Sequence, residues 1–260
     1  MGTHEPPIDF KLQRFWEQEE IVSPIRTKEE EAVERHFVET TTGDETGRFV
    51  VRLPRHSQNL QLGNSYTTAE YRFQQLERKL TRNLEVRKEY TKFMDEYLSL
   101  GHMQLVPEED DRSYDNASNK PIFFLPYHAV FKESSTTTKT RVVFDASAKS
   151  TTGVSLNDML MVGPTIQQDL ISIVLRFRMH TYAMTADIYK IYRQIRVKPE
   201  YYNLQRVLWR RSSDEPLKQY QLVTVTYGTA PASFLATRCV HKLASEEASS
   251  YPLAAEVIKS

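Results

Sequence analysis

Three short features carry residue types that could take part in chemistry, and they follow one another along the chain. The first is a hairpin whose polar tip and second strand carry three cations, Lys132, Lys139 and Arg141. The second is "TADIYKIYRQIRV" (185–197), which reads as an extended apolar stretch ending on Asp187, with Tyr192 five residues later. The third is "TVTYGTAPASF" (224–234), in which a predicted strand runs into Gly228 and then a helix. Taken alone, each has an ordinary structural explanation: a solvated hairpin, a strand cap and a glycine required by backbone geometry.

Several common catalytic signatures are absent from the sequence. The seven histidines are scattered, and His241, two residues from the single Cys239, lacks zinc-ligand spacing. There is no glycine-rich phosphate loop and no G-x-S-x-G nucleophile turn. The sequence therefore gives no support to a P-loop enzyme or a serine hydrolase.

The bulk composition is that of an ordinary globular protein. Of the 260 residues, 40% are hydrophobic and 26% are charged, and a single cysteine excludes an internal disulfide. No apolar run approaches the ~20 residues of a membrane span, and the start, "MGTHEPPIDF", lacks a signal-peptide pattern. We therefore expect a soluble, intracellular protein in the cytoplasm that has no membrane partner.

Charge is distributed unevenly although its sum is zero. Residues 1–47 hold 12 acidic and 5 basic side chains, a balance of −7. Residues 176–211 hold nine basic side chains and two acidic ones, a balance of +7. The basic stretch is either a polyanion-binding face, with an acidic segment elsewhere, or simply a solvated surface.

Periodicity and turn signals predict an α+β fold. Helices are expected over 9–20, 27–40, 67–100 (with a break near 83–87), 165–179 and from Pro231 onward. Capping-box spacing marks two of the helix starts, at Thr27 with Glu30 and at Thr67 with Glu70. Strands are expected at "RFVVRLP" and in two hairpins, "PIFFLPYHAVFK" with "TRVVFDAS" and "RVLWR" with "QYQLVTV", and the run 107–120 is expected to be a loop. Because strands and helices alternate without a regular βαβ rhythm, α+β describes the class better than α/β.

In this order and spacing the three features resemble the reverse transcriptases of retrotransposons, most closely those of BEL/Pao-type LTR elements. The resemblance covers about residues 60–260 and is carried by "HAVFKESSTTTKTRVVFDASAKSTTGVSLND", "VGPTIQQDL", "ADIYKIYRQI" and "VTYGTAPASFLATR". The string "LQRFWEQEEI" is similar to the connector that this family carries between protease and polymerase. The resemblance implies an acidic, helical extension over 1–65, followed over 66–260 by the fingers and the first part of the palm.

The resemblance also implies roles for Asp187 and its neighbours. Nucleotidyl transfer depends mostly on positioning and on charge neutralisation by two metal ions. Asp187 matches the first catalytic carboxylate of the palm, and the backbone carbonyl of Ile188 would be a further ligand of Mg²⁺. Tyr192 matches the aromatic residue that lies under the incoming sugar and excludes a 2′-hydroxyl by its bulk.

The other two features match the parts of the family's site that hold the nucleotide. Arg141 matches the fingers arginine that lies on the triphosphate, and either Lys132 or Lys139 would add a second cation there. Gly228, preceded by Tyr227, matches the segment whose backbone closely approaches the nascent base pair.

The sequence departs from the family pattern in two places. Pro231 stands two residues earlier than the proline that the family usually carries in this helix. The family's second carboxylate pair, Y-x-D-D on a hairpin, is absent, because the only adjacent aspartates, Asp110 and Asp111, precede Asp187. We therefore expect a fragment cut off before that hairpin, with an incomplete two-Mg²⁺ site and no polymerase activity of its own.

The sequence thus predicts a fragment of an RNA-directed DNA polymerase that acts on deoxynucleoside triphosphates and an RNA/DNA primer–template. Its other expected partner is the rest of the Pol polyprotein, in the cytoplasm and, by resemblance, in virus-like particles. The alternative is a non-enzymatic retroelement remnant that binds nucleic acid or a protein partner.

Overall fold

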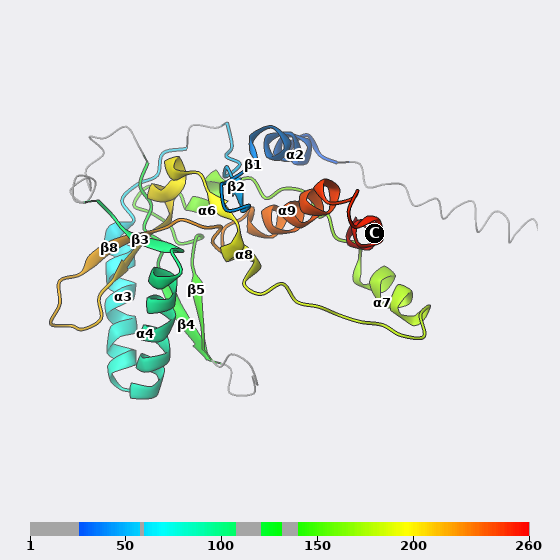
Figure 1. The fold of residues 1–260 in the computed structure, drawn as a ribbon. Helices are drawn as coiled ribbons and strands as arrows, with labels where there is room; N and C mark the ends of the chain where they lie inside the picture. The colour runs from blue at the N-terminus through cyan, green and yellow to red at the C-terminus, as the bar shows by residue number, and fades with distance from the viewer. Residues whose placement is uncertain (1–25, 58–59, 108–120, 132–139, 260) are drawn as a thin grey trace, which may run out of the picture.

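A computed structural model of the chain describes residues 26–57, 60–107, 121–131 and 140–259, and it has the mixed composition expected of an α+β protein (Figure 1). The predicted helix over 9–20, the loop 108–120 and the hairpin tip with Lys132 and Lys139 lie outside these residues. The helices of the described part are α2 (Lys28–Thr40), α3 (Tyr66–Thr81), α4 (Leu84–Ser99), α6 (Leu156–Met159), α7 (Leu170–Arg178), α8 (Ile191–Gln194), the 3₁₀ helix η1 (Pro199–Gln205), α9 (Ala232–Glu246) and α10 (Pro252–Lys259).

The strands form three small sheets. They are β1 (Thr42–Gly43), β2 (Phe49–Val51), β3 (Met103–Leu105), β4 (Tyr127–Phe131), β5 (Thr140–Phe144), β6 (Arg196–Val197), β7 (Arg206–Trp209) and β8 (Lys218–Leu222). The sheet orders are β1-β2-β6, β3-β8-β7 and β4-β5, and both predicted hairpins are confirmed as the antiparallel pairs β4–β5 and β7–β8.

Helices α3 and α4 form an antiparallel pair beside the β4–β5 hairpin (Figure 1). The predicted break between them is confirmed: α3 ends at Thr81, and the Asn83 side chain caps α4 by accepting a hydrogen bond from the Val86 N–H. Their inner faces meet the sheets through a cluster of aromatic side chains, Phe73, Tyr90, Tyr97, Tyr127, Phe144 and Trp209. This cluster anchors β5, which carries Arg141.

The described part of the N-terminal extension shares this core. Helix α2 begins with the predicted capping box of Thr27 and Glu30, and its Phe37 ring contacts Phe234 of α9 edge-on. Strand β2 pairs in parallel with β6, with Val50 opposite Arg196. Residues 26–51 therefore pack against the rest of the chain, and the boundary at 65/66 stays a prediction.

The predicted capping box at Thr67 and Glu70 is wrong. Helix α3 begins at Tyr66 after Ser65, and Ser65 forms no side-chain cap. Its hydroxyl instead accepts a hydrogen bond from the Phe124 N–H at 2.8 Å, while the Asn64 side chain accepts one from the Tyr66 N–H. A tertiary contact thus fixes the start of this helix.

The predicted strand before Asp187 is not formed. Residues 183–188 have no regular secondary structure and are exposed, with Met184 93% exposed. A strand is stable only when its backbone groups are paired in a ladder, and among the described residues no strand pairs with this segment. Asp187 therefore lies on an exposed segment rather than at a strand end.

Two predicted apolar faces are only partly buried. Helix α7 is shorter than the predicted 165–179, and none of its residues is buried, with Leu170 73% exposed. Figure 1 shows α7 and the segment that follows it standing out from the sheets. In α9 the expected face is buried from Ala232 to Cys239, but Leu243 is exposed and Ala244 is buried in its place.

Candidate functional site

The turn that carries Tyr227 and Gly228 lies directly against β5, the strand of Arg141. The Tyr227 hydroxyl donates a hydrogen bond to the Val142 carbonyl oxygen at 2.5 Å, and the Tyr227 ring lies 5.4 Å from that of Phe144. Burial raises the pKa of the Tyr227 hydroxyl further above its usual value, which favours its role as a donor. Two of the predicted features, far apart in sequence, are therefore adjacent in the structure.

Gly228 makes the closest approach between the turn and the strand. Its φ is +95°, a left-handed conformation that glycine adopts without a Cβ penalty. A Cβ at this position would stand 2.3 Å from the Phe144 carbonyl oxygen. Both the backbone angle and the available space thus require glycine here, while the outer side of Gly228 is exposed.

The Asn157 side chain, from the short helix α6, joins the same turn. Its Nδ2 donates to the Gly228 carbonyl oxygen at 3.0 Å, and its Oδ1 accepts from the Ala230 N–H at 2.8 Å. Sequence reasoning missed this residue, because an asparagine in a capped helix carries no signal of a contact with a distant turn. The capping box of Ser155 and Asp158 can be read from the sequence, but it indicates only where α6 begins.

Tyr192 reaches the turn from a third segment. It lies half-buried on α8, with its ring centroid 6.2 Å from that of Tyr227. The N-cap residue of α8 is Lys190, which has the left-handed φ of +52°. The structure thus brings Tyr192, Tyr227 and Gly228 together beside β5, whose Arg141 is exposed.

A charged cluster holds α8 in place. Arg193 is buried, forms an ion pair with Glu96 at 2.7 Å and lies over the Tyr97 ring at 4.1 Å. Lys190 contacts the same carboxylate. Burial opposes ionisation of Glu96, but the hydrogen bonds and charges of Lys190 and Arg193 outweigh it and hold the pKa of that carboxyl below its usual value.

His102 lies close to this cluster and is also buried. Its ring packs edge-on against Tyr97 at 5.9 Å, and its Nδ1 has no hydrogen-bond partner in the described structure. Burial, together with the charges of Arg193, Arg48 and Lys190, lowers the pKa of His102 from 6.5 to about 4, against a smaller opposing effect of Glu96. This histidine is therefore a neutral core residue at physiological pH.

The predicted metal ligands are not part of this assembly of contacts. Asp187 and Ile188 are both exposed, on the segment without regular structure. Within the described ranges, no group of three or more His, Cys, Asp or Glu side chains is gathered in a way that could hold a metal ion. A carboxylate with one backbone carbonyl is a small part of the oxygen shell that Mg²⁺ requires, so we derive no metal-dependent step from these residues.

The basic stretch 176–211 is not a continuous free surface. Five of its nine cations form ion pairs with carboxylates, namely Lys190, Arg193, Arg196, Arg210 and Arg211. A sixth, Arg206, is 1% exposed and bonded to Asn203 and Gln219. Most of the positive balance therefore stabilises the fold, and an excess counted along the sequence overstates the charge that is available to a polyanion.

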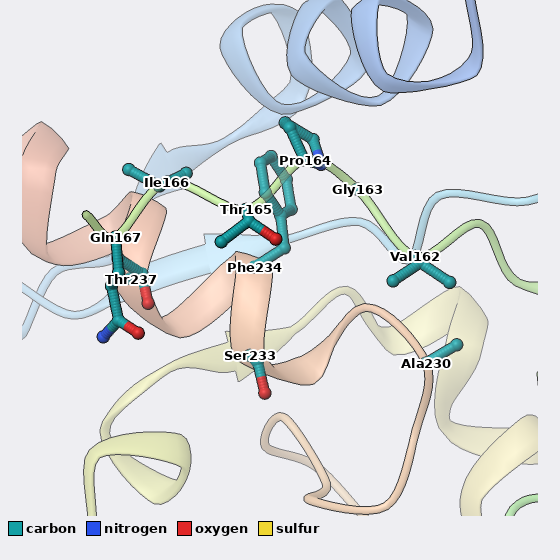
Figure 2. A pocket seen from close by; sticks show the side chains of 10 residues that line it. All are labelled: Val162, Gly163, Pro164, Thr165, Ile166, Gln167, Ala230, Ser233, Phe234 and Thr237. Atoms are coloured by element: carbon teal, nitrogen blue, oxygen red, sulfur yellow. The ribbon is translucent and has the colours of Figure 1, made fainter. Parts of the chain in front are cut away.

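A small cavity lies beside the turn, between the segment 162–167 and the start of α9 (Figure 2). Its volume is about 120 Å³, and the Phe234 ring forms part of its wall. Gly163 has φ +86°, and a Cβ there would stand 2.5 Å from the Phe234 ring. Close packing thus fixes this wall, and Thr165, Ser233 and Thr237 are among the other residues that line the cavity.

The chain matches no protein-family model and has no significant match among curated proteins. Within the part of the chain that the structure describes, no helix is both long and apolar enough to cross a membrane.

Proposed function

We propose that this chain is part of the reverse transcriptase of a BEL/Pao-type retroelement and contains the nucleotide-binding face of its fingers and early palm. In this proposal Arg141 holds the triphosphate, Tyr192 gates the sugar, and Tyr227 with Gly228 forms the floor under the nascent base pair. Asp187 and the Ile188 carbonyl are the chain's contribution to the Mg²⁺ site. The proposal rests first on the motif strings and their order along the sequence.

One structural observation supports this reading most strongly. The Tyr227–Gly228 turn packs on β5 through the Tyr227–Val142 hydrogen bond and the close approach of Gly228 to Phe144. Tyr192 then contacts Tyr227 from a third segment. Residues that were assigned to one nucleotide site from separate motifs are thus neighbours, although neither composition nor periodicity requires it.

The 260 residues are expected to bind but not to polymerise. After Asp187 the sequence contains a single aspartate, Asp214, which lies in an exposed connection between β7 and β8. Two-metal transfer requires carboxylates that clamp both ions. We therefore expect no primer extension by this chain on an RNA template in the presence of Mg²⁺ or Mn²⁺.

A binding titration tests the proposal directly. Fluorescence anisotropy with a labelled DNA primer on an RNA template should give a Kd on the order of 10⁻⁶ M or weaker at physiological salt. The affinity should rise log-linearly as salt is lowered, because phosphate contacts release counterions.

Variants at matched exposed arginines make this test specific. Arg141→Ala, on β5, should weaken binding and reduce the salt slope by about one ion. Arg35→Ala removes the same charge from an exposed position on α2. This control should change neither the affinity for the primer–template nor its salt slope. Absence of binding at low salt by soluble, monomeric protein, or equal effects of the two substitutions, would count against the proposed site.

A second candidate is a non-enzymatic remnant that binds a protein partner. It is favoured by the run of exposed apolar residues in 170–189, which includes Leu170, Ile171, Leu175, Met179, Tyr182, Met184 and Tyr189. In the polymerase proposal, the rest of the Pol polyprotein covers this face. Nucleic-acid binding that depends on Arg141 favours the polymerase fragment over the remnant.

A further inference from the structure

Asn157 occupies a junction between three segments of the fold. Its backbone N–H donates to the Ala146 carbonyl oxygen at 3.0 Å, which ties it to the segment that leaves β5. Its side-chain Nδ2 donates to the Ser147 hydroxyl at 2.9 Å and to the Gly228 carbonyl oxygen at 3.0 Å. Its Oδ1 accepts the Ala230 N–H at 2.8 Å. One side chain thus bridges the exit of β5 and both sides of the turn.

The chemistry of this bridge requires an amide. The Gly228 carbonyl can only accept a hydrogen bond and the Ala230 N–H can only donate one, so the orientation of the Asn157 amide is fixed by its partners. Aspartate would keep an acceptor for Ala230, but it would place a carboxylate against the Gly228 carbonyl oxygen. Alanine would leave both backbone groups of the turn without their partner.

The turn has few other external anchors. Thr229 bonds within the turn, through its N–H and its hydroxyl to the Thr226 carbonyl. Tyr227 fixes the start of the turn by its bond to Val142. Gly228 packs on the Phe144 backbone, and the hydrogen bonds from the half Gly228–Ala230 to the segment that leaves β5 run through Asn157.

We propose that Asn157 is a positioning residue that holds the Gly228–Ala230 half of the turn at a fixed distance from β5. The inference rests on the proposed function, since the turn is the floor of the nucleotide site and β5 carries the triphosphate arginine. Because the Gly228 carbonyl is engaged by Asn157, the peptide plane after Gly228 is held in one orientation, and its exposed face is presented to the ligand pre-formed.

Two readouts test the bridge and its role separately. The first is amide hydrogen exchange at Ala230, measured by NMR under native conditions. In Asn157→Ala this amide should exchange about tenfold faster, the effect of losing one hydrogen bond. The second is the primer–template affinity by anisotropy, which should fall at least about fivefold while the salt slope is unchanged, because no cation is removed.

A neighbouring variant supplies the control. Asp158 belongs to the same helix, where it completes the Ser155 capping box and pairs with Lys149. Asp158→Asn should lower stability without changing either the Ala230 exchange rate or the affinity. Asn157→Asp should give exchange close to that of the parent but an affinity at least as low as that of Asn157→Ala, because the Gly228 bond is lost and a negative charge is added, whereas the Ser147 hydroxyl can rotate to donate to the carboxylate.

The outcomes distinguish the inference from the function on which it rests. Equal Ala230 exchange in Asn157→Ala and Asp158→Asn would overturn the bridge itself. Faster exchange with parent-like affinity would overturn the positioning role and leave Asn157 a purely structural residue. Absence of primer–template binding by the parent chain would overturn the proposed function and, with it, the role of the bridge, whatever the exchange data show.

Discussion

Removal of the His102 imidazole should change how the stability of the protein depends on pH. His102 is 3% exposed, and its Nδ1 has no partner in the described structure. Its pKa is lowered from 6.5 to about 4 by burial and by nearby cations. Between these two values the unfolded chain binds a proton at this residue and the folded chain does not, so acid favours unfolding.

The magnitude follows from the two pKa values. At pH 5 the unfolded imidazole is almost fully protonated and the folded one is mostly neutral, which lowers the free energy of unfolding by about 2 kcal/mol. At pH 7.5 the same linkage contributes on the order of 0.1 kcal/mol or less. The stabilising effect of the neutral state is thus complete above 6.5 and is lost as the pH falls toward 4.

The assay is urea unfolding followed by the fluorescence of the tryptophans, one of which, Trp209, is buried, at pH 7.5 and pH 5. His102→Gln and His102→Asn remove the titration and differ in packing, so they should differ from one another at both pH values. Relative to the parent, both should lose about 2 kcal/mol less stability on going to pH 5. If the parent and both variants showed the same loss, the buried, neutral state of His102 would be refuted.

Three further outcomes follow from the described contacts. Gly228→Ala should destabilise the fold by about 1–3 kcal/mol more than Gly47→Ala in urea titrations, because both positions have positive φ but only Gly228 has no room for a Cβ. A double-mutant cycle of Arg193→Met with Glu96→Gln should give a coupling energy of about 1–2 kcal/mol, and it should vanish as the pH falls through the lowered pKa of Glu96. Phe177→Ser on α7 should reduce the binding of a hydrophobic dye while changing the unfolding free energy by less than about 0.5 kcal/mol, since no residue of this helix is buried.

Local signals predicted the elements that local interactions stabilise. The Thr27–Glu30 capping box marks the start of α2, and its reciprocal hydrogen bonds lie within four residues. The break between α3 and α4 follows equally from short-range rules, and so does the start of α9, which begins at Ala232 with Pro231 as its N-cap rather than in its first turn. These features were readable because the residues that cause them are adjacent in the sequence.

Contacts between distant segments were not readable in this way. The parallel pairing of β2 with β6 puts Val50 beside Arg196. The sequence of neither strand indicates which strand it will pair with. The Asn157 bridge and the use of the Ser65 hydroxyl by Phe124 are of the same kind. A single sequence reports propensity and periodicity, whereas these contacts depend on which segments the core brings together.

The predicted site residues fall into two groups, according to whether other described segments of the chain hold them in place. Tyr192, Tyr227 and Gly228 are held by rings, hydrogen bonds and close packing against segments that the chain itself supplies. Asp187 was predicted at a strand end, with the Ile188 carbonyl directly after it, and a strand requires a neighbour to pair with its backbone.

The exposure of α7 and the missing strand at Asp187 are both cases of a segment that lacks a packing partner among the described residues. Nine consecutive residues with the sequence "LISIVLRFR" form a helix without burying a side chain, and the apolar residues that follow it are exposed as well. An exposed apolar surface of this extent is stabilised when another part of the protein packs against it. An unpaired extended segment is stabilised when a neighbouring strand pairs with its backbone. In the proposed polymerase, the rest of the Pol polyprotein would supply both. In that proposal the conformation of Asp187 is set in the assembled palm, whereas the turn at Gly228 is held by its packing on β5 and by Asn157.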